Sequence, residues 1–199
     1  MEVRVLACPH CAAKISSNAK VCEYCGYEYM ISSFSSLLKI GRQDINKYVA
    51  AYSDALKTNP NDPSLNRSAG ICFMSLGIYD KALACFERQI DSNPEGSFAY
   101  YVSAMCLLNG KSAFITEKKK IDKAIEYLKA AIVIEEKGIY HYLMAYFKYD
   151  YYKRKFLKIE PDYNYHLSAA HSFGVSTEDI LDLFNLLKVE VPKGFLETA

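Results

Sequence analysis

Apolar and polar positions divide the chain into a short N-terminal segment and a long region with a helical pattern. After Tyr29 the composition changes to alanine, aromatic residues and other helix formers, and apolar residues recur at intervals typical of helices. Pro60, Pro94 and Pro161 each follow such a segment and predict helix ends, because proline cannot continue a helix. The pattern predicts an all-α fold for most of the chain.

The helical region also has an internal period. Pro60 and Pro94 lie 34 residues apart, and Cys72 and Cys106 are separated by the same interval. A fixed period of this length is typical of a fold built from stacked helical hairpins. We therefore expect several copies of one two-helix unit.

The central copy is carried by residues 66–94, NRSAGICFMSLGIYDKALACFERQIDSNP. It resembles the tetratricopeptide repeat, with Gly70 and Ala82 at the small positions where two helices approach closely. Phe73 and Phe86 are expected to fill the gap between units. The resemblance implies a solenoid with its best repeat at 63–96, divergent repeats at 31–62 and 97–136, and divergent helices with a C-terminal cap at 137–199.

Three further local patterns complete this region. Residues 139–159, IYHYLMAYFKYDYYKRKFLKI, predict a long amphipathic helix or a tight helical pair. The charged run EKKK at 117–120 is expected to be an exposed loop. Ser176 and Asp179 stand at the spacing of a capping box at the start of the last helix.

Composition restricts the class of protein further. Hydrophobic residues make up 51% of the chain and charged residues 24%, which indicates a folded rather than a disordered protein. The formal net charge of +1 provides no overall attraction to nucleic acid or to an anionic membrane. The sequence shows no signal-peptide pattern and no apolar run long enough to cross a bilayer, so we expect a cytoplasmic protein with reduced thiols.

Four cysteines form two close pairs near the N-terminus. Cys8 and Cys11 are separated by two residues, as are Cys22 and Cys25, with ten residues between the pairs. A metal site, two disulfides or a redox centre could use such pairs, but a reducing compartment and this spacing favour one tetrahedral Zn²⁺ held by four thiolates. In the gap, the residues SSNAK at 16–20 predict the tip of a small hairpin.

The cysteine segment resembles a short zinc ribbon over residues 5–29, within a predicted module at 1–30. Gly26 follows the second pair as in that family, whereas Ala12 follows the first pair where glycine is usual. Four thiolates fill the coordination sphere, so His10 is expected to be an exposed non-ligand and the ion to be structural rather than catalytic.

The predicted solenoid offers a candidate docking face. Helical spacing places six side chains on the concave side of two first helices, where they either contact a protein partner or pack in the core. Three further cysteines are interpreted as small core residues rather than reactive thiols. The six are Arg67, Ile71, Met74, Tyr101, Met105 and Leu108, and the cysteines are Cys72, Cys85 and Cys106.

A second candidate surface is a basic strip at 148–158. Eight of the 17 tyrosines lie between Tyr140 and Tyr165, and basic residues are interleaved with them. Such a strip could grip phosphates and stack bases, but packing and protein contact are favoured because the whole chain is nearly neutral. The strip comprises Lys148, Lys153, Arg154, Lys155 and Lys158.

No catalytic constellation stands out. The sequence has no glycine-rich phosphate loop, no serine elbow and no paired histidine motif, and His166 and His171 are poorly spaced to share a metal. We therefore expect a non-enzymatic adaptor whose solenoid docks a protein partner while the ribbon is structural or provides a second contact. The alternatives are nucleic-acid binding through the ribbon and the basic strip, and redox sensing in which oxidation of the thiolates releases zinc.

Overall fold

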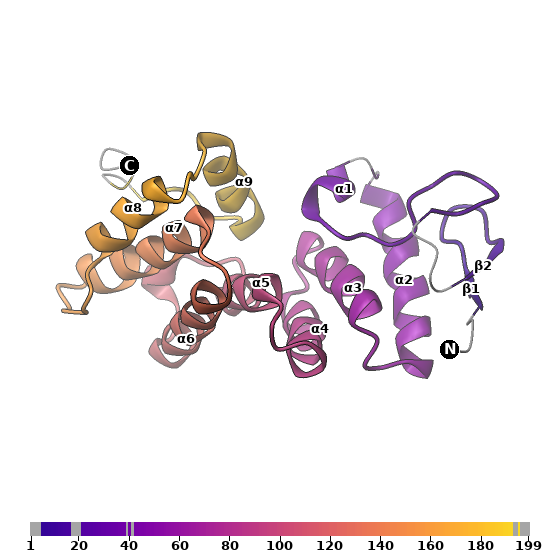
Figure 1. Ribbon diagram of the computed structural model, residues 1–199, viewed down its shortest axis with the longest axis horizontal. Coiled ribbons are helices and arrows are strands. Elements are labelled where there is room, and N and C mark those ends of the chain that lie inside the picture. The colour runs from indigo at the N-terminus through magenta and orange to yellow at the C-terminus, as the bar shows by residue number, and fades with distance from the viewer. Residues whose placement is uncertain (1–4, 17–20, 39, 41, 193–194, 196–199) are drawn as a thin grey trace. The chain divides into compact units, whose positions relative to one another are not determined.

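A computed structural model describes residues 5–16, 21–38, 40, 42–192 and 195 (Figure 1). The chain forms two compact units, Met1–Asn93 and Pro94–Ala199. Among the described residues, no helix combines the length and the apolarity needed to span a membrane.

The first unit begins with a small antiparallel hairpin. Strand β1 (Val5–Ala7) pairs with β2 (Lys14–Ser16), with Leu6 opposite Ile15. Beyond β2, an isolated bridge joins Val21 and Glu28. The predicted hairpin tip lies mostly outside the described residues.

Four helices follow the hairpin in the described part of the first unit. They are α1 (Phe34–Leu38), α2 (Arg42–Thr58), α3 (Pro63–Ser75) and α4 (Tyr79–Ser92). Asp62 starts α3, because its side chain accepts a hydrogen bond of 2.9 Å from the Leu65 amide and Pro63 follows at the first helical position. α2 packs against α3, and α3 packs against α4 to form the best-defined hairpin.

Close approach of α3 and α4 depends on Gly70. A Cβ atom at this position would lie only 2.7 Å from the ring of Phe86, which is fully buried. The prediction that Gly70 is a small contact position is confirmed. Phe86, which we expected between units, lies against Gly70 within one hairpin, because α4 turns its ring onto the partner helix.

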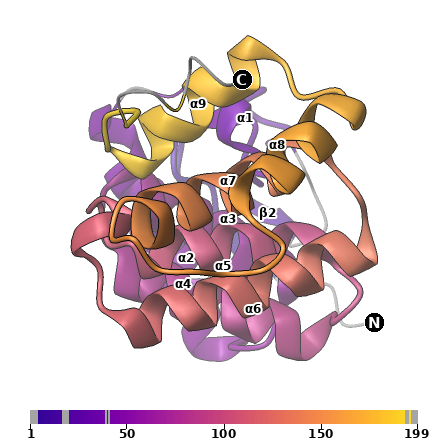
Figure 2. The same ribbon diagram turned by 90° about the vertical axis from the view of Figure 1, so that its left-hand side faces the viewer.

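The second unit consists of packed helices with two short irregular turns. α5 packs against α6, α6 against α7, and α7 against α8 (Figure 2). The elements are α5 (Ser97–Leu107), the 3₁₀ turn η1 (Ala113–Ile115), α6 (Lys118–Ile134), α7 (Gly138–Phe147), the π-helical turn η2 (Lys148–Lys153), α8 (Tyr163–Ser172) and α9 (Thr177–Leu187).

Two local expectations for this unit are wrong. Residues 139–159 form neither an amphipathic helix nor a tight helical pair: α7 is buried on all sides between 140 and 147 and continues directly into the π-helical turn η2, which ends at Lys153. The basic residues of EKKK are not a loop either, since Lys118–Lys120 form the exposed first turn of α6. Lysine is a good helix former, and its charge disfavours burial without disfavouring the helix.

The start of α9 matches the sequence. The Asp179 amide donates to the Ser176 hydroxyl oxygen at 3.1 Å, and the Ser176 amide donates to the Asp179 carboxylate at 3.0 Å. The predicted capping box is confirmed.

Candidate metal centre

Two backbone turns with the same hydrogen-bond pattern hold the four cysteines. In the first, the Cys8 amide donates to the Ala13 carbonyl at 2.8 Å, and the Ala12 amide donates to the Cys8 carbonyl at 2.9 Å. Ala12 has φ of 61°, in the left-handed region that normally favours glycine. The second turn repeats these bonds at 2.9 Å each, from Cys22 to Tyr27 and from Gly26 to Cys22, with φ of 72° at Gly26.

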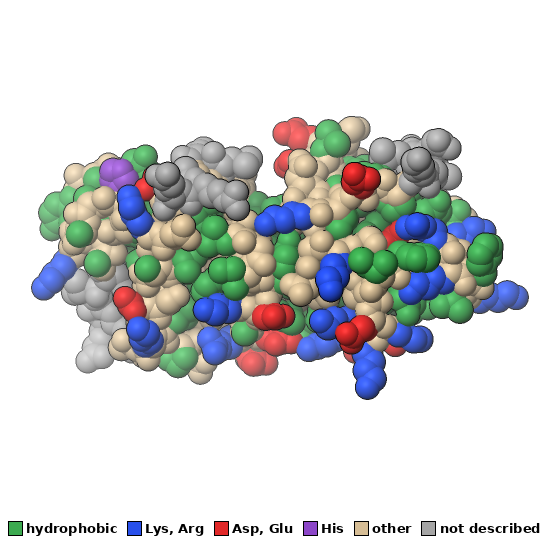
Figure 3. All heavy atoms as spheres, turned by 180° about the vertical axis from the view of Figure 1, so that it is seen from behind, with side chains coloured by type: hydrophobic (Ala, Val, Ile, Leu, Met, Phe, Trp, Pro, Cys, Tyr) green, Lys and Arg blue, Asp and Glu red, His purple; other side chains and the backbone are tan. Residues whose placement is uncertain are grey.

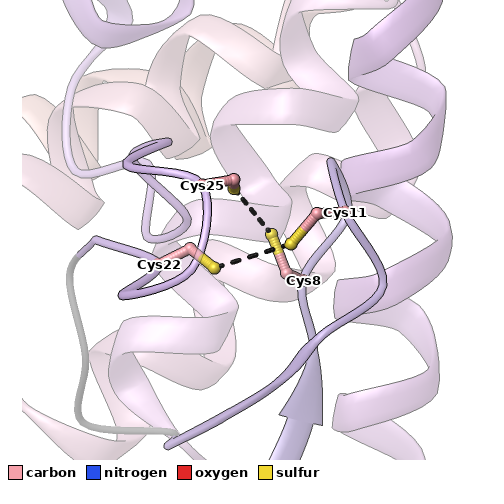
Figure 4. Close-up of side chains that lie close together, drawn as sticks. All are labelled: Cys8, Cys11, Cys22 and Cys25. Carbon is pink, nitrogen blue, oxygen red and sulfur yellow. Dashed lines mark hydrogen bonds between the residues drawn. The ribbon is translucent and has the colours of Figure 1, made fainter.

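The turns bring four sulfur atoms together (Figure 4). The Cys8 and Cys25 sulfurs lie 3.7 Å apart, as do those of Cys11 and Cys22, and all four lie within 4.8 Å of one another. A tetrahedral zinc with Zn–S bonds of about 2.3 Å requires sulfur–sulfur distances of about 3.8 Å, whereas a disulfide requires about 2.05 Å. The spacing fits four ligands of one ion and excludes two disulfides.

Backbone amides favour the thiolate form at this cluster. Burial of the Cys22 side chain opposes its ionisation, but the amides of Cys25 and Tyr24 point at its sulfur, and its pKa is lowered to about 7. Cys8 receives the amides of Cys11 and His10 in the same way, although burial prevails there and raises its pKa. The Tyr27 amide favours the Cys25 thiolate, but burial and the neighbouring thiols prevail and raise the pKa of Cys25 to about 12. Thiolate, rather than thiol, is the form that binds a metal.

Helix α2 holds the segment that leaves the cluster. The Tyr48 hydroxyl donates to the Glu28 carbonyl at 2.9 Å, and the Tyr52 hydroxyl donates to the Tyr29 carbonyl. The Ile31 amide in turn donates to the Tyr52 oxygen at 3.3 Å. Since both tyrosine rings are buried, the ribbon is attached to the first long helix by specific bonds rather than by apolar contact alone.

His10 lies beside the cluster without joining it. Its exposed ring stacks on Tyr27 at 3.8 Å between centroids and 10° between planes, which fastens the first turn to the second. Within the described parts of the chain, the four cysteines are the only group of three or more metal-ligating side chains close enough to share an ion.

Comparisons with known proteins agree with this geometry. Residues 8–28 match the family model of the zinc-ribbon domain. The described helices resemble solved structures of MamA, a tetratricopeptide-repeat protein. MamA from strain MSR-1 matches with TM-score 0.54 and 17% identity over 70% of this chain and 72% of that one. MamA from strain AMB-1 matches with TM-score 0.54 and 18% identity, over 74% of each chain.

A third similar structure, a MamA double mutant from strain RS-1, matches with TM-score 0.50 and 20% identity over 76% of this chain and 71% of that one. At such identities the likeness concerns the fold alone. The chain therefore carries an N-terminal zinc ribbon followed by a tetratricopeptide-like array of helical hairpins.

The predicted apolar docking face is not on the surface. Its five apolar or aromatic members are buried, four of them almost completely, so these side chains form core. The sixth, Arg67, is half-buried and donates from Nε to the Ser32 carbonyl at 2.8 Å. The helical stripe that suggested a partner site is explained by packing. The buried members are Ile71, Met74, Tyr101, Met105 and Leu108.

The five residues of the predicted basic strip have different environments in the structure. Lys148 is buried, and Arg154 forms an ion pair with the fully buried Asp150. Lys155 lies over the ring of Tyr151, with Nζ 3.7 Å from its centroid. Lys153 and Lys158 remain exposed. The five residues therefore do not form one continuous exposed strip.

Lys148 belongs instead to a buried polar cluster that the sequence did not reveal. Its Nζ lies 2.9 Å from His166 Nε2, and His166 Nδ1 lies 3.1 Å from Nδ1 of His141, which comes from another helix. Burial lowers the pKa of Lys148 to about 8 and that of His166 to about 3. Spacing along the sequence suggested only His171 as a neighbour of His166, because a contact between two different helices leaves no local pattern in the sequence.

The remaining cysteines are core residues, as expected. Cys72, Cys85 and Cys106 are all buried. Burial raises the pKa of Cys72 to about 12 and that of Cys85 to about 11, so neither thiol ionises near neutral pH.

Proposed function

We propose that this protein is a non-enzymatic adaptor in which a structural zinc ion folds a ribbon that contacts a protein partner, next to a tetratricopeptide-like scaffold. The observation that carries the proposal is the closed cluster of four sulfurs, attached to α2 through Tyr48 and Tyr52. An ion held by four thiolates has no open position for water or substrate, so it stabilises structure and does not catalyse.

The ion supplies folding energy that the ribbon lacks. A segment this short buries too little apolar surface to fold alone, and structural zinc contributes about 10–16 kcal/mol in comparable small modules. In a reducing compartment such as the cytoplasm, where we place the protein, the thiolates stay available for the metal.

The ribbon also offers a surface for protein contact. Val21, Tyr24 and Tyr27 are 50%, 68% and 40% exposed, and Tyr27 is held in place by its stack on His10. Aromatic side chains held rigidly on a surface are enriched at protein interfaces, because they bury a large area at little entropic cost. Nucleic-acid binding has less support, since Lys148 is buried and Arg154 is paired.

Affinity capture with quantitative mass spectrometry tests the proposal. We expect the zinc-loaded protein to retain a specific set of proteins, and the double variant Tyr24→Ser, Tyr27→Ser to lose them while keeping one zinc per chain. Val133→Ser is the matched control, because Val133 is 86% exposed on α6 and belongs to the second unit, whereas the ribbon belongs to the first. Equal retention by the double variant, or a protein set that disappears only with nuclease treatment, would contradict the proposal.

A further inference from the structure

The segment between η2 and α8 presents apolar side chains to solvent in an ordered turn. Phe156 is 96% exposed and Leu157 is 47% exposed. Phe156 has φ of 58°, a conformation that is unfavourable for a residue with a large side chain. A bulky apolar residue held in such a conformation and pointing into water indicates a function that depends on its exposure.

Backbone bonds keep this turn in place. The Phe156 amide donates to the Lys153 carbonyl at 3.0 Å, and the Leu157 amide donates to the Tyr152 carbonyl at 2.8 Å. The Arg154 guanidinium, paired with Asp150, lies 4.5 Å from the centroid of the Phe114 ring. The turn is thus fixed to the helical body at its base, and its tip is presented as a rigid knob.

Basic residues flank the apolar tip of this turn in the sequence. Lys153, Lys155 and Lys158 flank Phe156 and Leu157 in sequence, and none of the three forms an ion pair with a described carboxylate. Asp150, the only acidic residue between 148 and 158, is neutralised by Arg154. Lys153 and Lys158 therefore place positive charge beside the apolar side chains of the tip, while Lys155 lies over the ring of Tyr151.

A third apolar residue lies near the base of the turn. Ile115 is 67% exposed at the end of η1, and η1 packs against η2. In Figure 3, green apolar and blue basic side chains lie side by side on the second unit. We call Lys153–Ile159 together with Ile115 the basic–apolar knob.

We propose that the basic–apolar knob docks the protein on an anionic lipid bilayer, with Phe156 and Leu157 inserted at the interface and the flanking lysines on headgroup phosphates. An apolar tip ringed by basic groups is complementary to such a surface in both hydrophobicity and charge. The contact is peripheral and local, so it does not require a high net charge on the whole chain. It is independent of the adaptor proposal, which rests on the ribbon.

A membrane fits the knob better than single-stranded RNA does. Two of its three exposed apolar side chains, Ile115 and Leu157, are aliphatic and have no ring face on which a base could stack. Tyr151, a ring next to the knob, is buried and covered by Lys155, and the Phe114 ring is covered by Arg154. Knob residues, among them Lys153, Phe156 and Lys158, also line a hollow of about 430 Å³. The carboxylates of Glu160 and Asp162 line it too and disfavour an anionic ligand inside it.

Insertion can be followed directly because the chain contains no tryptophan. In the zinc-loaded protein, Phe156→Trp places the only tryptophan of the chain at the tip, where it can be excited apart from the 17 tyrosines. With vesicles of phosphatidylcholine and phosphatidylglycerol we expect a blue-shifted emission that brominated acyl chains quench. The matched control Val133→Trp, at another exposed apolar site, should show neither effect. An unshifted spectrum at Phe156→Trp would overturn the proposal.

Vesicle co-sedimentation separates the contribution of the apolar side chains to membrane binding from that of the lysines. Phe156→Ser with Leu157→Ser should weaken binding at least about ten-fold, and Lys153→Gln with Lys158→Gln about five-fold per lysine at low salt. Lys47→Gln with Lys57→Gln removes the same net charge from α2 and should leave binding unchanged. Equal binding by all variants, or binding to RNA or to poly-glutamate in place of vesicles, would refute membrane docking.

Discussion

Ala12 and Gly26 show how one dihedral angle links sequence to metal binding. They occupy equivalent positions after the two cysteine pairs, and both adopt positive φ. This conformation costs an L-amino acid with a Cβ atom about 1–2 kcal/mol and costs glycine little. The departure from glycine at Ala12, visible in the sequence, is thus accommodated by strain and not by a different turn.

The two positions give opposite predictions for zinc affinity. Ala12→Gly should tighten zinc binding about five-fold by relieving the strained φ, because metal binding and ribbon folding are coupled. Gly26→Ala should weaken it by a similar factor, and a Cβ atom there would meet nothing within 4 Å, so no clash confuses the comparison. Competition with a chromophoric chelator measures both. Weaker binding by Ala12→Gly would show that its φ is not the limiting feature.

At the scale of the helix pair, the spacing of α3 and α4 depends on the contact between Gly70 and Phe86. The 34-residue period revealed the repeat and its small positions, because sterics at a close helix contact act on single residues at fixed intervals. The same period did not predict that α7 is buried on all sides. α7 packs against both α6 and α8, and its nearly continuous run of apolar and aromatic residues fits burial on all sides better than a one-sided stripe does.

Gly70→Ala should destabilise the first unit. The new methyl group would lie 2.7 Å from a ring that is fully buried and has little room to move, and overpacking of this kind costs about 1–3 kcal/mol. Removing glycine from a helix returns about 1 kcal/mol, so we expect a net loss of roughly 1 kcal/mol in urea unfolding.

A double variant tests the cause of that loss. In a Phe86→Leu background the clash is removed, and Gly70→Ala should become neutral or stabilising. An unchanged cost in that background would mean that Gly70 is needed for a reason other than contact with Phe86.

For the whole molecule, we expect metal binding and helix packing to stabilise separate parts of the chain. We propose that the ribbon needs an ion for its fold, whereas the helices of the second unit bury a large core of their own, from Ala99 to Leu187. The two sources of stability should therefore respond differently to metal removal.

Chelation of zinc should unfold the ribbon and spare the second unit. We expect amide hydrogen exchange to become fast at Cys22, Gly26 and Ile31, whose amides are hydrogen-bonded in and around the ribbon, while α5–α7 keep their protection. Mass spectrometry of exchanged peptides measures both regions in one experiment. Loss of protection throughout the second unit would show that its fold depends on the metal.

The sequence by itself determined the features that depend on local spacing: the clustering of the four cysteines, the helical repeat, the close contact at Gly70 and the cap at Ser176. Each is fixed by residues a few positions apart or by a regular period. Only the tertiary structure decided which side of each helix is covered. It buried the predicted docking face, placed Lys148 beside His166 and His141, and left Phe156 in water. Burial is set by neighbours distant along the chain, and a helical stripe has the same pattern whether it faces a core or a partner.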